Sequence, residues 1–344
     1  MRPPMAGPRE FVVEEASPLD AAIRRALGLS WGQARRLVEQ GKVSVDGGRA
    51  VVPTFRVRAG ASVRVDPAAR RQPPEHALSP ERLVYVDAHV VVVNKPAGVS
   101  TVPYEDGERG TLDELVRREL GARTGARGVA PSLGVVHRLD KETSGLVVFT
   151  RSWLAKKSLA AQFRAHTVAR RYLAIARGRV APCTIESHLL ADRGDGLRGS
   201  LERVPARMRA GREGQRAVTH VEPLEALHEG ELEATLVACR LETGRTHQIR
   251  IHLAERGHPL LGERVYGRPF GARSVEPEIP APRVMLHAAL LGFVHPKTER
   301  PMEWSLPPPE DFMTVLRRLG HSATSNDFST VTGPPEKGGT RAPR

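Results

Sequence analysis

The pattern of apolar positions predicts two short helices near the start of the chain. In the first, apolar side chains return every three or four positions, at Leu19, Ala22, Ile23, Ala26 and Leu27. Ser17 is expected to cap this helix, with Pro18 at its first position and Gly28 at its end. A second helix is expected to open with a capping box formed by Ser30 and Gln33.

A small sheet is expected to follow these helices. Alternating valines predict strands at 43–45, 51–52, 57 and 63–65, with a turn at 46–48. Residues 17–66 are therefore predicted to form one compact module. Residues 1–16 are rich in proline and polar side chains, and we interpret them as a flexible lead-in.

A larger second domain is expected over residues 81–320, after a proline-rich linker at 67–80. Apolar runs predict buried strands at 133–136 and 146–149, and further strands in the segments YLAIARGRV, ELEATLVACRL and RVMLHAALLGFV. Residues 191–216 are rich in glycine and predict a mobile loop. Residues 321–344 are polar without periodicity, which predicts a disordered tail.

Composition narrows the class of protein. A length of 344 residues suits two domains, and 40% hydrophobic residues are enough for a substantial core. The net charge of +13 favours a polyanionic partner such as nucleic acid. The longest aliphatic runs are far too short to cross a membrane, and residues 1–10 do not resemble a secretory signal. Two cysteines cannot build a disulfide framework, which favours the reducing cytoplasm.

The densest polar cluster between apolar runs is HRLDKETSG, residues 137–145. Charged side chains beside buried strands are costly unless they are paired. The cluster can therefore be a turn held by an ion pair between Arg138 and Asp140, or a site of chemistry. Ser144 lacks the Gly-x-Ser-x-Gly surroundings of a hydrolase nucleophile, which argues against a serine hydrolase.

Histidines offer a metal-binding hypothesis that their spacing does not favour. The candidates are His247, His252, His287 and His295. The first two are five positions apart, which is neither the i,i+4 helical spacing nor the same-face strand spacing. We therefore expect no metal ion.

The first module resembles the small RNA-binding domain named after ribosomal protein S-four. The resemblance rests on the stretch PLDAAIRRALGLSWGQARRLVEQGKVSVDGGRAV and on VRAGASVRVD. It implies an RNA-binding face on the helices and the turn that follows them. The basic residues placed there are Arg24, Arg25, Arg35, Arg36 and Lys42. The alternative for these side chains is a solvated helix face without a partner.

The second domain resembles pseudouridine synthases of the RluA type. HRLDKETSGL matches their signature, and four further segments follow their motifs in order: NKPAGVSTVP, ARRYLAIARG, LETGRTHQIRIHLAERGHPLLGE and LHAALLGFVHP. The resemblance implies an α+β fold with a mixed, mostly antiparallel central sheet, preceded by the small α/β RNA-binding module. It also implies isomerisation of uridine to pseudouridine in RNA, without a metal or organic cofactor.

The same resemblance assigns roles to individual residues. Asp140 is the catalytic carboxylate, Arg250 the cation that keeps it ionised, and Tyr172 a side chain that stacks on the base and transfers a proton. Whether Asp140 attacks the ribose, attacks the base or removes a ribose proton stays open. A surface ion pair for Arg250 and an ordinary core position for Tyr172 are the alternatives.

Four more residues complete the predicted site. Leu286 is expected to pack against the base, with plain core as its alternative. Arg138 is expected to reach into the RNA when the target base flips out. His137 shares this loop, with a structural histidine as the alternative, and Arg245 is expected to make a phosphate or structural contact.

Ribosomal RNA of the large subunit is the expected substrate, because relatives that carry the extra module tend to act there. Transfer RNA is the second candidate. A rival from another class is a non-catalytic RNA-binding or ribosome-assembly protein that keeps the fold. We expect the protein to act as a monomer, without a membrane.

Overall fold

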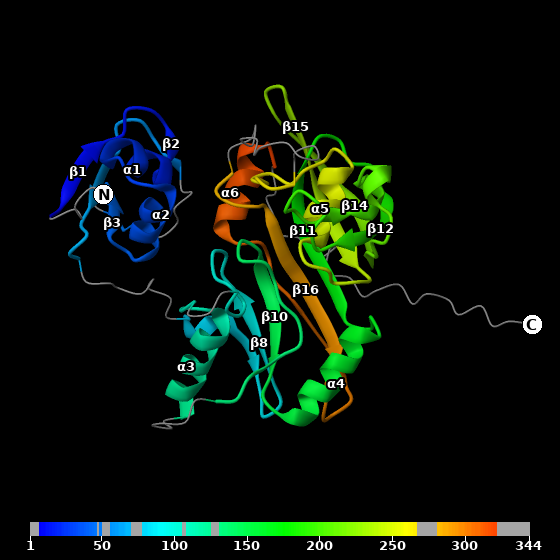
Figure 1. The fold of residues 1–344 in the computed structure, drawn as a ribbon. Helices are drawn as coiled ribbons and strands as arrows, with labels where there is room; N and C mark the ends of the chain where they lie inside the picture. Colours follow the sequence, from blue (N-terminus) through cyan, green and yellow to red (C-terminus); the bar gives the residue numbers. More distant parts are fainter. Residues whose placement is uncertain are drawn as a thin grey trace, which may run out of the picture. The chain divides into compact units, whose positions relative to one another are not determined.

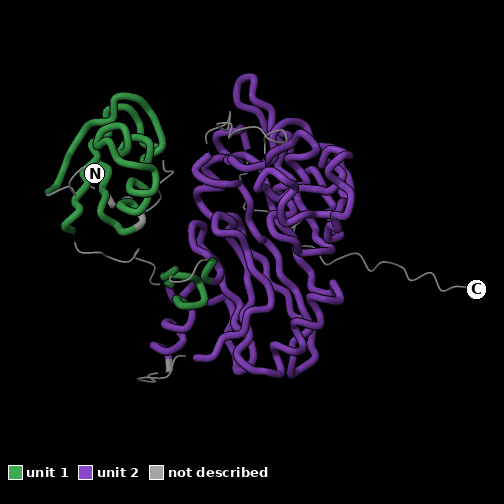
Figure 2. Tube along the Cα trace, viewed as in Figure 1, with its two compact units in different colours: residues 1–78, 103–115 green, residues 79–102, 116–344 purple. Residues whose placement is uncertain are grey.

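The computed structural model describes residues 7–46, 48–49, 56–69, 78–104, 108–124, 131–266 and 281–321. The chain divides into two compact units, each with its own core. The first comprises residues 1–78 and 103–115, and the second comprises residues 79–102 and 116–344 (Figure 2). The expected strand at 51–52, most of the expected linker and nearly all of the expected tail lie outside the described residues.

The first unit packs two helices beside a small sheet. Its elements are β1 (Arg9–Val12), β2 (Ser17–Pro18), α1 (Leu19–Leu27), α2 (Trp31–Glu39), β3 (Val43–Val45), β4 (Gly48–Arg49), β5 (Arg56–Val57) and β6 (Ser62–Val65). The main sheet has the order β1-β6-β3-β4, and β2 pairs with β5. The capping box is confirmed, because Ser30 and Gln33 bond each other's backbone N–H groups at 3.3 and 2.9 Å.

Three expectations for this unit are wrong in detail. Residues 9–12 are not a flexible lead-in, because they form β1 and pair with β6. An edge strand needs few apolar side chains, so its sequence pattern is weak. Ser17 does not cap α1; it lies in β2 opposite Val57, and Pro18 occupies the cap position without a side-chain bond. Ala26 is exposed, because the apolar face of α1 is narrower than expected.

The second unit is built on one large sheet (Figure 1). Its strands are β7 (Leu83–Val86), β8 (Val90–Lys95), β9 (Gly134–Val135), β10 (Ser144–Thr150), β11 (Ala169–Arg177), β12 (Cys183–Leu190), β13 (Gly199–Ser200), β14 (Gln215–Glu229), β15 (Leu232–Leu241), β16 (Leu286–Val294) and β17 (Pro301–Ser305). Its helices are η1 (Pro80–Arg82), α4 (Trp153–Arg164), η2 (Leu201–Arg203), η3 (Ala206–Met208), α5 (Gln248–Glu255) and α6 (Glu310–Arg318), and α3 (Leu112–Thr124) spans the boundary between the units.

The sheet order is β13-β12-β14-β15-β11-β16-β10-β8-β7, with β17 on β16 and β9 on β10. Among the described strands, β10 and β16 are parallel and the other neighbours are antiparallel. The expected mixed, mostly antiparallel sheet is therefore confirmed. The core under α6 includes Leu173, Met285 and Phe312, and the core under α4 includes Val148 and Leu159.

A glycine sets the contact between β10 and β16. Gly145 has a φ of +111°, and a Cβ atom there would lie 2.2 Å from the main-chain oxygen of Ala288. Only glycine allows both this backbone conformation and this close approach. The approach brings the loop before β10 beside the first residue of β16, Leu286.

Residues 191–216 are not the loose loop that their glycine content predicts. The segment forms β13, η2 and η3 and contains a buried ion pair between Arg193 and Asp195 at 2.8 Å. It also packs on α5, because the backbone N–H of Ser200 donates to Glu255 at 2.9 Å. The 191–216 segment therefore supports the helix that carries Arg250. Among the described residues, no helix is long and apolar enough to cross a membrane.

Candidate active site

A pocket of about 510 Å³ opens in the second unit where four segments meet. These segments are the loop before β10, the end of α4 with the start of β11, the turn into α5, and the start of β16. Among the described residues, the pocket's charged lining consists of one carboxylate, from Asp140, and the guanidinium groups of Arg138, Arg164, Arg170, Arg245 and Arg250. Such a volume suits a nucleotide, and such a charge suits an anionic polymer.

Main-chain bonds hold the loop that carries Asp140. The N–H of Thr143 donates to the main-chain oxygen of Asp140 at 3.0 Å and closes a turn. The hydroxyl of Thr101 donates to the oxygen of Leu139 at 2.8 Å and accepts from its N–H at 3.1 Å. Asp140 is thereby fixed from both sides while its carboxylate faces the pocket.

Lys95 hydrogen-bonds to the same loop from the end of β8, and the sequence pattern does not single it out. It ends β8 with a fully buried side chain, whose ammonium donates to the oxygens of Val99 at 2.6 Å and Lys141 at 3.0 Å. Burial lowers the pKa of Lys95 to about 7, and the nearby charge of Asp140 opposes this. A charged residue at the end of a strand that begins with four valines, 90–93, is the available signal.

Arg250 lies on α5 between two carboxylates. One of its terminal nitrogens is 3.5 Å from Asp140 Oδ2. Its stronger partner is Glu263, which accepts from Nε at 2.7 Å and from the second terminal nitrogen at 3.0 Å. Burial alone would raise the pKa of Glu263, but the bonds from Arg250 hold it below its usual value. The expected partner of Asp140 is therefore itself anchored by an acid that the sequence did not single out.

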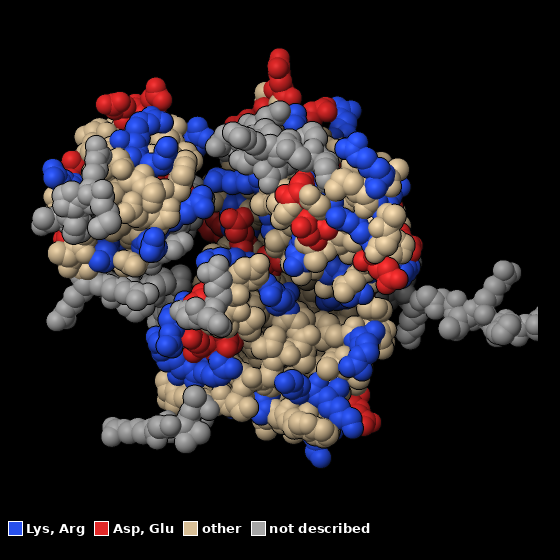
Figure 3. All heavy atoms as spheres, viewed as in Figure 1, with Lys and Arg blue, Asp and Glu red and all other residues tan. Residues whose placement is uncertain are grey.

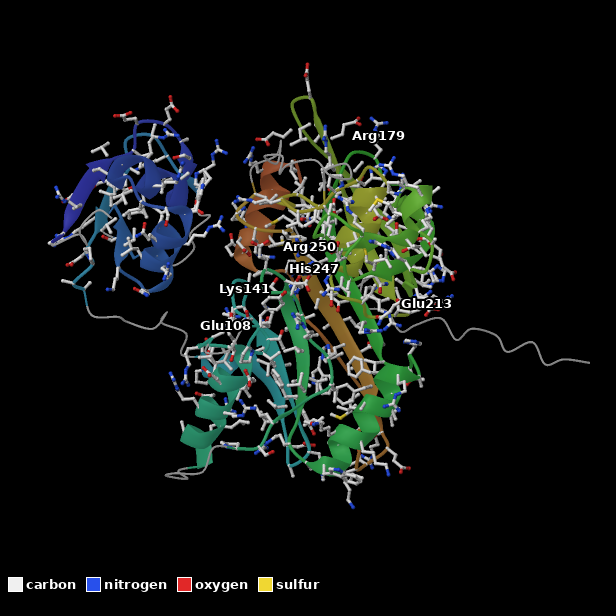
Figure 4. The ribbon with its side chains drawn as sticks, in the orientation of Figure 1. Glu108, Lys141, Arg179, Glu213, His247 and Arg250 are labelled. Carbon is white, nitrogen blue, oxygen red and sulfur yellow. The ribbon has the colours of Figure 1, made fainter. Side chains whose placement is uncertain are left out.

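His247 sits directly before α5, and Figure 4 labels it beside Arg250. It also faces Asp140. Its Nε2 is 3.7 Å from Asp140 Oδ1, and its Nδ1 is hydrogen-bonded to the hydroxyl of Tyr266. The residue has a left-handed backbone with a φ of 59°. Burial lowers the pKa of His247, while Asp140 opposes the shift. The sequence pattern suggests this residue only as a candidate metal ligand.

Gln248 holds the turn that aims His247 and Arg250. Its side-chain oxygen accepts from the hydroxyl of Thr243 at 2.7 Å and from the N–H of Arg245 at 3.0 Å. Its amide nitrogen donates to the main-chain oxygen of Val218 at 2.9 Å. This buried amide joins the end of β15, the turn and β14 into one frame.

Tyr172 and Leu286 form an apolar wall of the pocket. Tyr172 lies on β11, next to an irregular pairing with β16, and Leu286 is the first residue of β16. Both side chains are buried, and burial raises the pKa of Tyr172. The structure thus brings the predicted Asp140, Tyr172, Arg250 and Leu286 around one cavity.

His137, Arg138 and Arg245 line the same pocket. His137 stacks on Phe163 with centroids 4.6 Å apart, and its Nε2 accepts from the N–H of Val148 at 3.0 Å. Burial lowers the pKa of His137 to about 3, so it is neutral and fits its structural alternative. Arg138 is exposed, and Arg245 donates to the oxygen of Arg216 at 3.1 Å. RNA contacts by these residues stay predictions.

The basic residues predicted in the first unit lie on its two helices and directly after them. Arg24, Arg25, Arg35 and Arg36 are exposed on α1 and α2. Arg35 donates to the buried Asp20 at 2.9 Å, Arg25 lies 3.6 Å from Glu15, and Arg24 lies over the exposed ring of Trp31. Lys42 is half-buried and donates to the main-chain oxygen of Pro67.

The four candidate metal-binding histidines are spread over the second unit, and each bonds a protein group. His247 bonds Tyr266, His252 bonds Ser187, His287 bonds Ser144, and His295 bonds Asp87. Within the described parts of the chain, no group of three or more side chains has the arrangement of a metal site.

Comparisons with known proteins match both units. The family model described as RNA pseudouridylate synthase matches residues 89–255, and the S4 domain model matches residues 17–63. A Zymomonas mobilis relative named ribosomal large subunit pseudouridine synthase D is 37% identical over 295 residues, covering 85% of this chain and 90% of the relative. A Bacillus subtilis relative named uncharacterized RNA pseudouridine synthase YhcT is 38% identical over 237 residues, covering 68% and 71%.

Solved structures share the fold of the second unit. Human RNA pseudouridylate synthase domain containing 1 has a TM-score of 0.50 at 25% identity and covers 65% of this chain and 82% of its own. Human RNA pseudouridylate synthase domain containing 4 has a TM-score of 0.54 at 22% identity, covering 70% and 93%. The expected fold class is confirmed. The chain belongs to the RNA pseudouridylate synthase family, a family of isomerases, and carries an S4 domain before its catalytic domain.

Proposed function

We propose that the protein converts uridine to pseudouridine in ribosomal RNA of the large subunit. The observation that carries the proposal is Asp140, the one carboxylate in the described lining of a pocket otherwise rich in guanidinium groups, set between Arg250 and His247. The choice of RNA rests on the relatives from Zymomonas mobilis and Nitrosomonas europaea, both named for the large ribosomal subunit.

The reaction is an isomerisation, so every atom of the uridine stays in the product. The bond between the ribose C1′ and N1 of the base breaks, the base turns, and C5 bonds to C1′. The C5 proton leaves and N1 gains a proton. In this proposal Asp140 supplies the carboxylate that acts on the nucleotide, and the Tyr172 hydroxyl transfers a proton at the base.

The remaining pocket residues hold the groups that react. Arg250 and its partner Glu263 set the position of Asp140 and balance its charge. Leu286 contacts the face of the flipped base. Arg138, exposed at the rim, fills the space that the base leaves in the RNA, while Arg245 contacts a phosphate.

The two units divide the work in this proposal. The module over 17–66 binds RNA through Arg24, Arg25, Arg35, Arg36 and Lys42, and the domain over 81–320 carries out the reaction. The separate cores of the two units support this division. We propose that the protein acts as a monomer in the cytoplasm, where its free cysteines, Cys183 and Cys239, suit reducing conditions.

The test is pseudouridine mapping in all RNAs of cells that carry the wild-type protein, the Asp140→Asn variant or no copy. We expect one or more large-subunit sites that disappear in the last two strains. Sites lost from transfer RNA instead would contradict the choice of substrate. An unchanged map, with ribosome assembly impaired only in cells without the protein, would favour the non-catalytic alternative.

A further inference from the structure

Among the residues that the structure describes, Arg170 is a buried cation without an acidic partner. Four arginines are buried among the described residues, namely Arg170, Arg193, Arg250 and Arg283. Three of them form close ion pairs: Arg193 with Asp195 at 2.8 Å, Arg250 with Glu263 at 2.7 Å, and Arg283 with Asp311 at 2.6 Å. Arg170 is equally buried, at 8% exposure, yet no carboxylate lies within ion-pair distance in the described structure.

The few contacts of Arg170 fix its position without balancing its charge. One terminal nitrogen donates to the main-chain oxygen of Glu242 at 3.1 Å, while the Glu242 carboxylate bonds His220 instead. The guanidinium carbon lies 5.6 Å from the centre of the Phe163 ring. The buried Nε of Arg170 has no hydrogen-bond partner within the described ranges of the chain.

The surrounding backbone is shaped to leave room for this guanidinium. A Cβ atom at Gly244 would lie 2.6 Å from the second terminal nitrogen of Arg170. Gly244 belongs to the segment that continues into Arg245, and both residues line the pocket together with Arg170 and Tyr172. The turn thus exposes a cation to the pocket where any larger residue would displace it.

An uncompensated buried charge is strongly destabilising in a folded protein, so its presence indicates a partner supplied by a bound ligand. The pocket already carries an excess of guanidinium groups over carboxylates, so the missing partner is an anion. RNA brings one anion with every nucleotide, and arginine binds phosphate through parallel N–H bonds.

We propose that Arg170 binds a phosphodiester group adjacent to the flipped uridine and so places that nucleotide against Tyr172 and Asp140. The inference rests on the proposed function, because it takes RNA as the ligand and this pocket as the place of reaction. It assigns to Arg170 a binding role that is distinct from the pairing of Arg250 with Asp140.

The test neutralises the proposed ion pair from both sides: the cation of Arg170 by substitution, and the anion of the RNA by a methylphosphonate. The probe is a synthetic RNA hairpin that carries the uridine located by the mapping experiment. It is made in four forms: unmodified, with a neutral methylphosphonate on the 5′ side of that uridine, with one on its 3′ side, and with one four linkages away. Binding and single-turnover pseudouridine formation are measured for wild type, Arg170→Gln and Arg170→Lys. Arg171→Gln is the matched control, since it lies on the same strand outside the pocket lining.

We expect one of the two adjacent methylphosphonates to weaken binding to wild type and to Arg171→Gln by about tenfold, because a hydrogen bond to a charged group contributes about that factor. The same methylphosphonate should leave binding to Arg170→Gln unchanged. Arg170→Lys keeps the charge and should retain part of the effect. Equal losses in all four proteins, with each variant folded by circular dichroism, would overturn the proposal.

A structural role and a failure of the proposed function give different results. If Arg170 only supports the fold, Arg170→Gln lowers the melting temperature while the adjacent methylphosphonate still weakens its binding, which overturns the proposal. If the protein binds the hairpin with this charge coupling but forms no pseudouridine, the phosphate contact stands and the assigned reaction fails. The binding and product readouts therefore separate the two proposals.

Discussion

The neighbours of Asp140 determine the position of its carboxylate and the charge around it. The loop bonds of Thr101 and Thr143 fix its backbone, while Arg250 and His247 face its two oxygens at 3.5 and 3.7 Å. These distances are longer than hydrogen bonds, so the carboxylate stays available to a substrate while its charge is balanced.

We predict that Asp140→Asn reduces pseudouridine formation to below a tenth of the wild-type rate. The amide is nearly the same shape but cannot be ionised, so it can act neither as a nucleophile nor as a base. RNA affinity, measured by equilibrium titration, should stay within a few-fold. A variant that retains more than a tenth of the single-turnover rate would refute the role of Asp140.

Arg250 gives a second prediction at this scale, because it serves two acids. Arg250→Leu leaves the buried Glu263 without a partner, and breaking such a buried pair lowers the free energy of unfolding by about 3–5 kcal/mol. It should also impair catalysis more than binding. Arg250→Lys should recover only part of both, since an ammonium cannot reproduce the paired bonds of a guanidinium.

The matched comparison for Arg250 is Glu263→Gln. It weakens the anchor but keeps the cation beside Asp140, so we expect a smaller loss of rate than in Arg250→Leu. Urea denaturation and single-turnover kinetics measure the two effects separately. If both variants lose the same rate, Arg250 acts through the fold alone and has no direct influence on Asp140.

At the scale of elements, the parallel contact between β10 and β16 joins the loop of Asp140 to the pocket wall that contains Leu286. Gly145 makes this contact possible, because Ala288 comes so close. α5 is joined to the same region by the Gln248 bonds and is supported from outside by the 191–216 insertion. Three segments that are distant in the sequence are therefore joined around one pocket.

We predict that Gly145→Ala destabilises the protein by more than the roughly 1–2 kcal/mol of left-handed strain, because its methyl group also meets the oxygen of Ala288. Gly98→Ala is the matched control: its φ is +81°, but nothing lies within 4 Å of a Cβ there. Thermal denaturation compares the two. Equal losses would mean that strand spacing does not depend on Gly145.

At the scale of the whole molecule, the net charge of +13 is distributed over two units. Figure 3 shows Lys and Arg side chains spread over the visible face of each unit, with acidic side chains between them. In residues 1–70, 12 basic residues stand against 7 acidic ones. The basic excess of the first seventy residues is a charge that attracts polyanions, and the described pocket is lined by residues of the second unit.

We predict that replacing Arg24, Arg25 and Arg36 together by glutamine weakens RNA binding and lowers its salt dependence. Each lost phosphate contact reduces the slope of log K against log salt by about 0.7–0.9, so the triple variant should lose about two units. Arg179→Gln, an exposed site on the second unit, is the control (Figure 4). An unchanged slope would show that these helices do not contact RNA.

We also predict a loss of stability in mild acid. Burial lowers the pKa of His137 to about 3 and the pKa values of His252 and His287 to about 4. Above about pH 6.5 neither the folded nor the unfolded chain protonates these rings. Between about pH 6.5 and 4 only the unfolded chain binds the protons, so the free energy of unfolding falls as pH falls, by about 1.4 kcal/mol per ring and pH unit.

Urea denaturation at several pH values checks this acid dependence. His252→Gln retains a hydrogen-bonding side chain opposite Ser187 and Thr219 but removes one of the three titrating rings. It should flatten the pH dependence by about one third. A slope equal to that of wild type would show that His252 is protonated equally in the folded and unfolded states.

The sequence by itself determined the features that depend on neighbours along the chain. The spacing of Leu19, Ile23 and Ala34 placed the helices of the first unit, and continuous apolar runs placed β10 and β16. Motif resemblance identified Asp140, Tyr172 and Arg250, which the structure brings around one pocket. Each of these signals lies within a short stretch of chain, where local periodicity and residue type are informative.

Only the tertiary structure decided which distant groups meet. Glu263 follows Arg250 by a turn whose geometry no periodicity encodes, and Lys95 reaches the loop of Asp140 from a strand more than forty positions earlier. β1 forms because it pairs with β6, and the 191–216 segment is held on α5 by the hydrogen bond from Ser200 to Glu255. Arg170 has no carboxylate within ion-pair distance in the described part of the chain, and this absence depends on residues that are distant in sequence, so only the folded structure shows it.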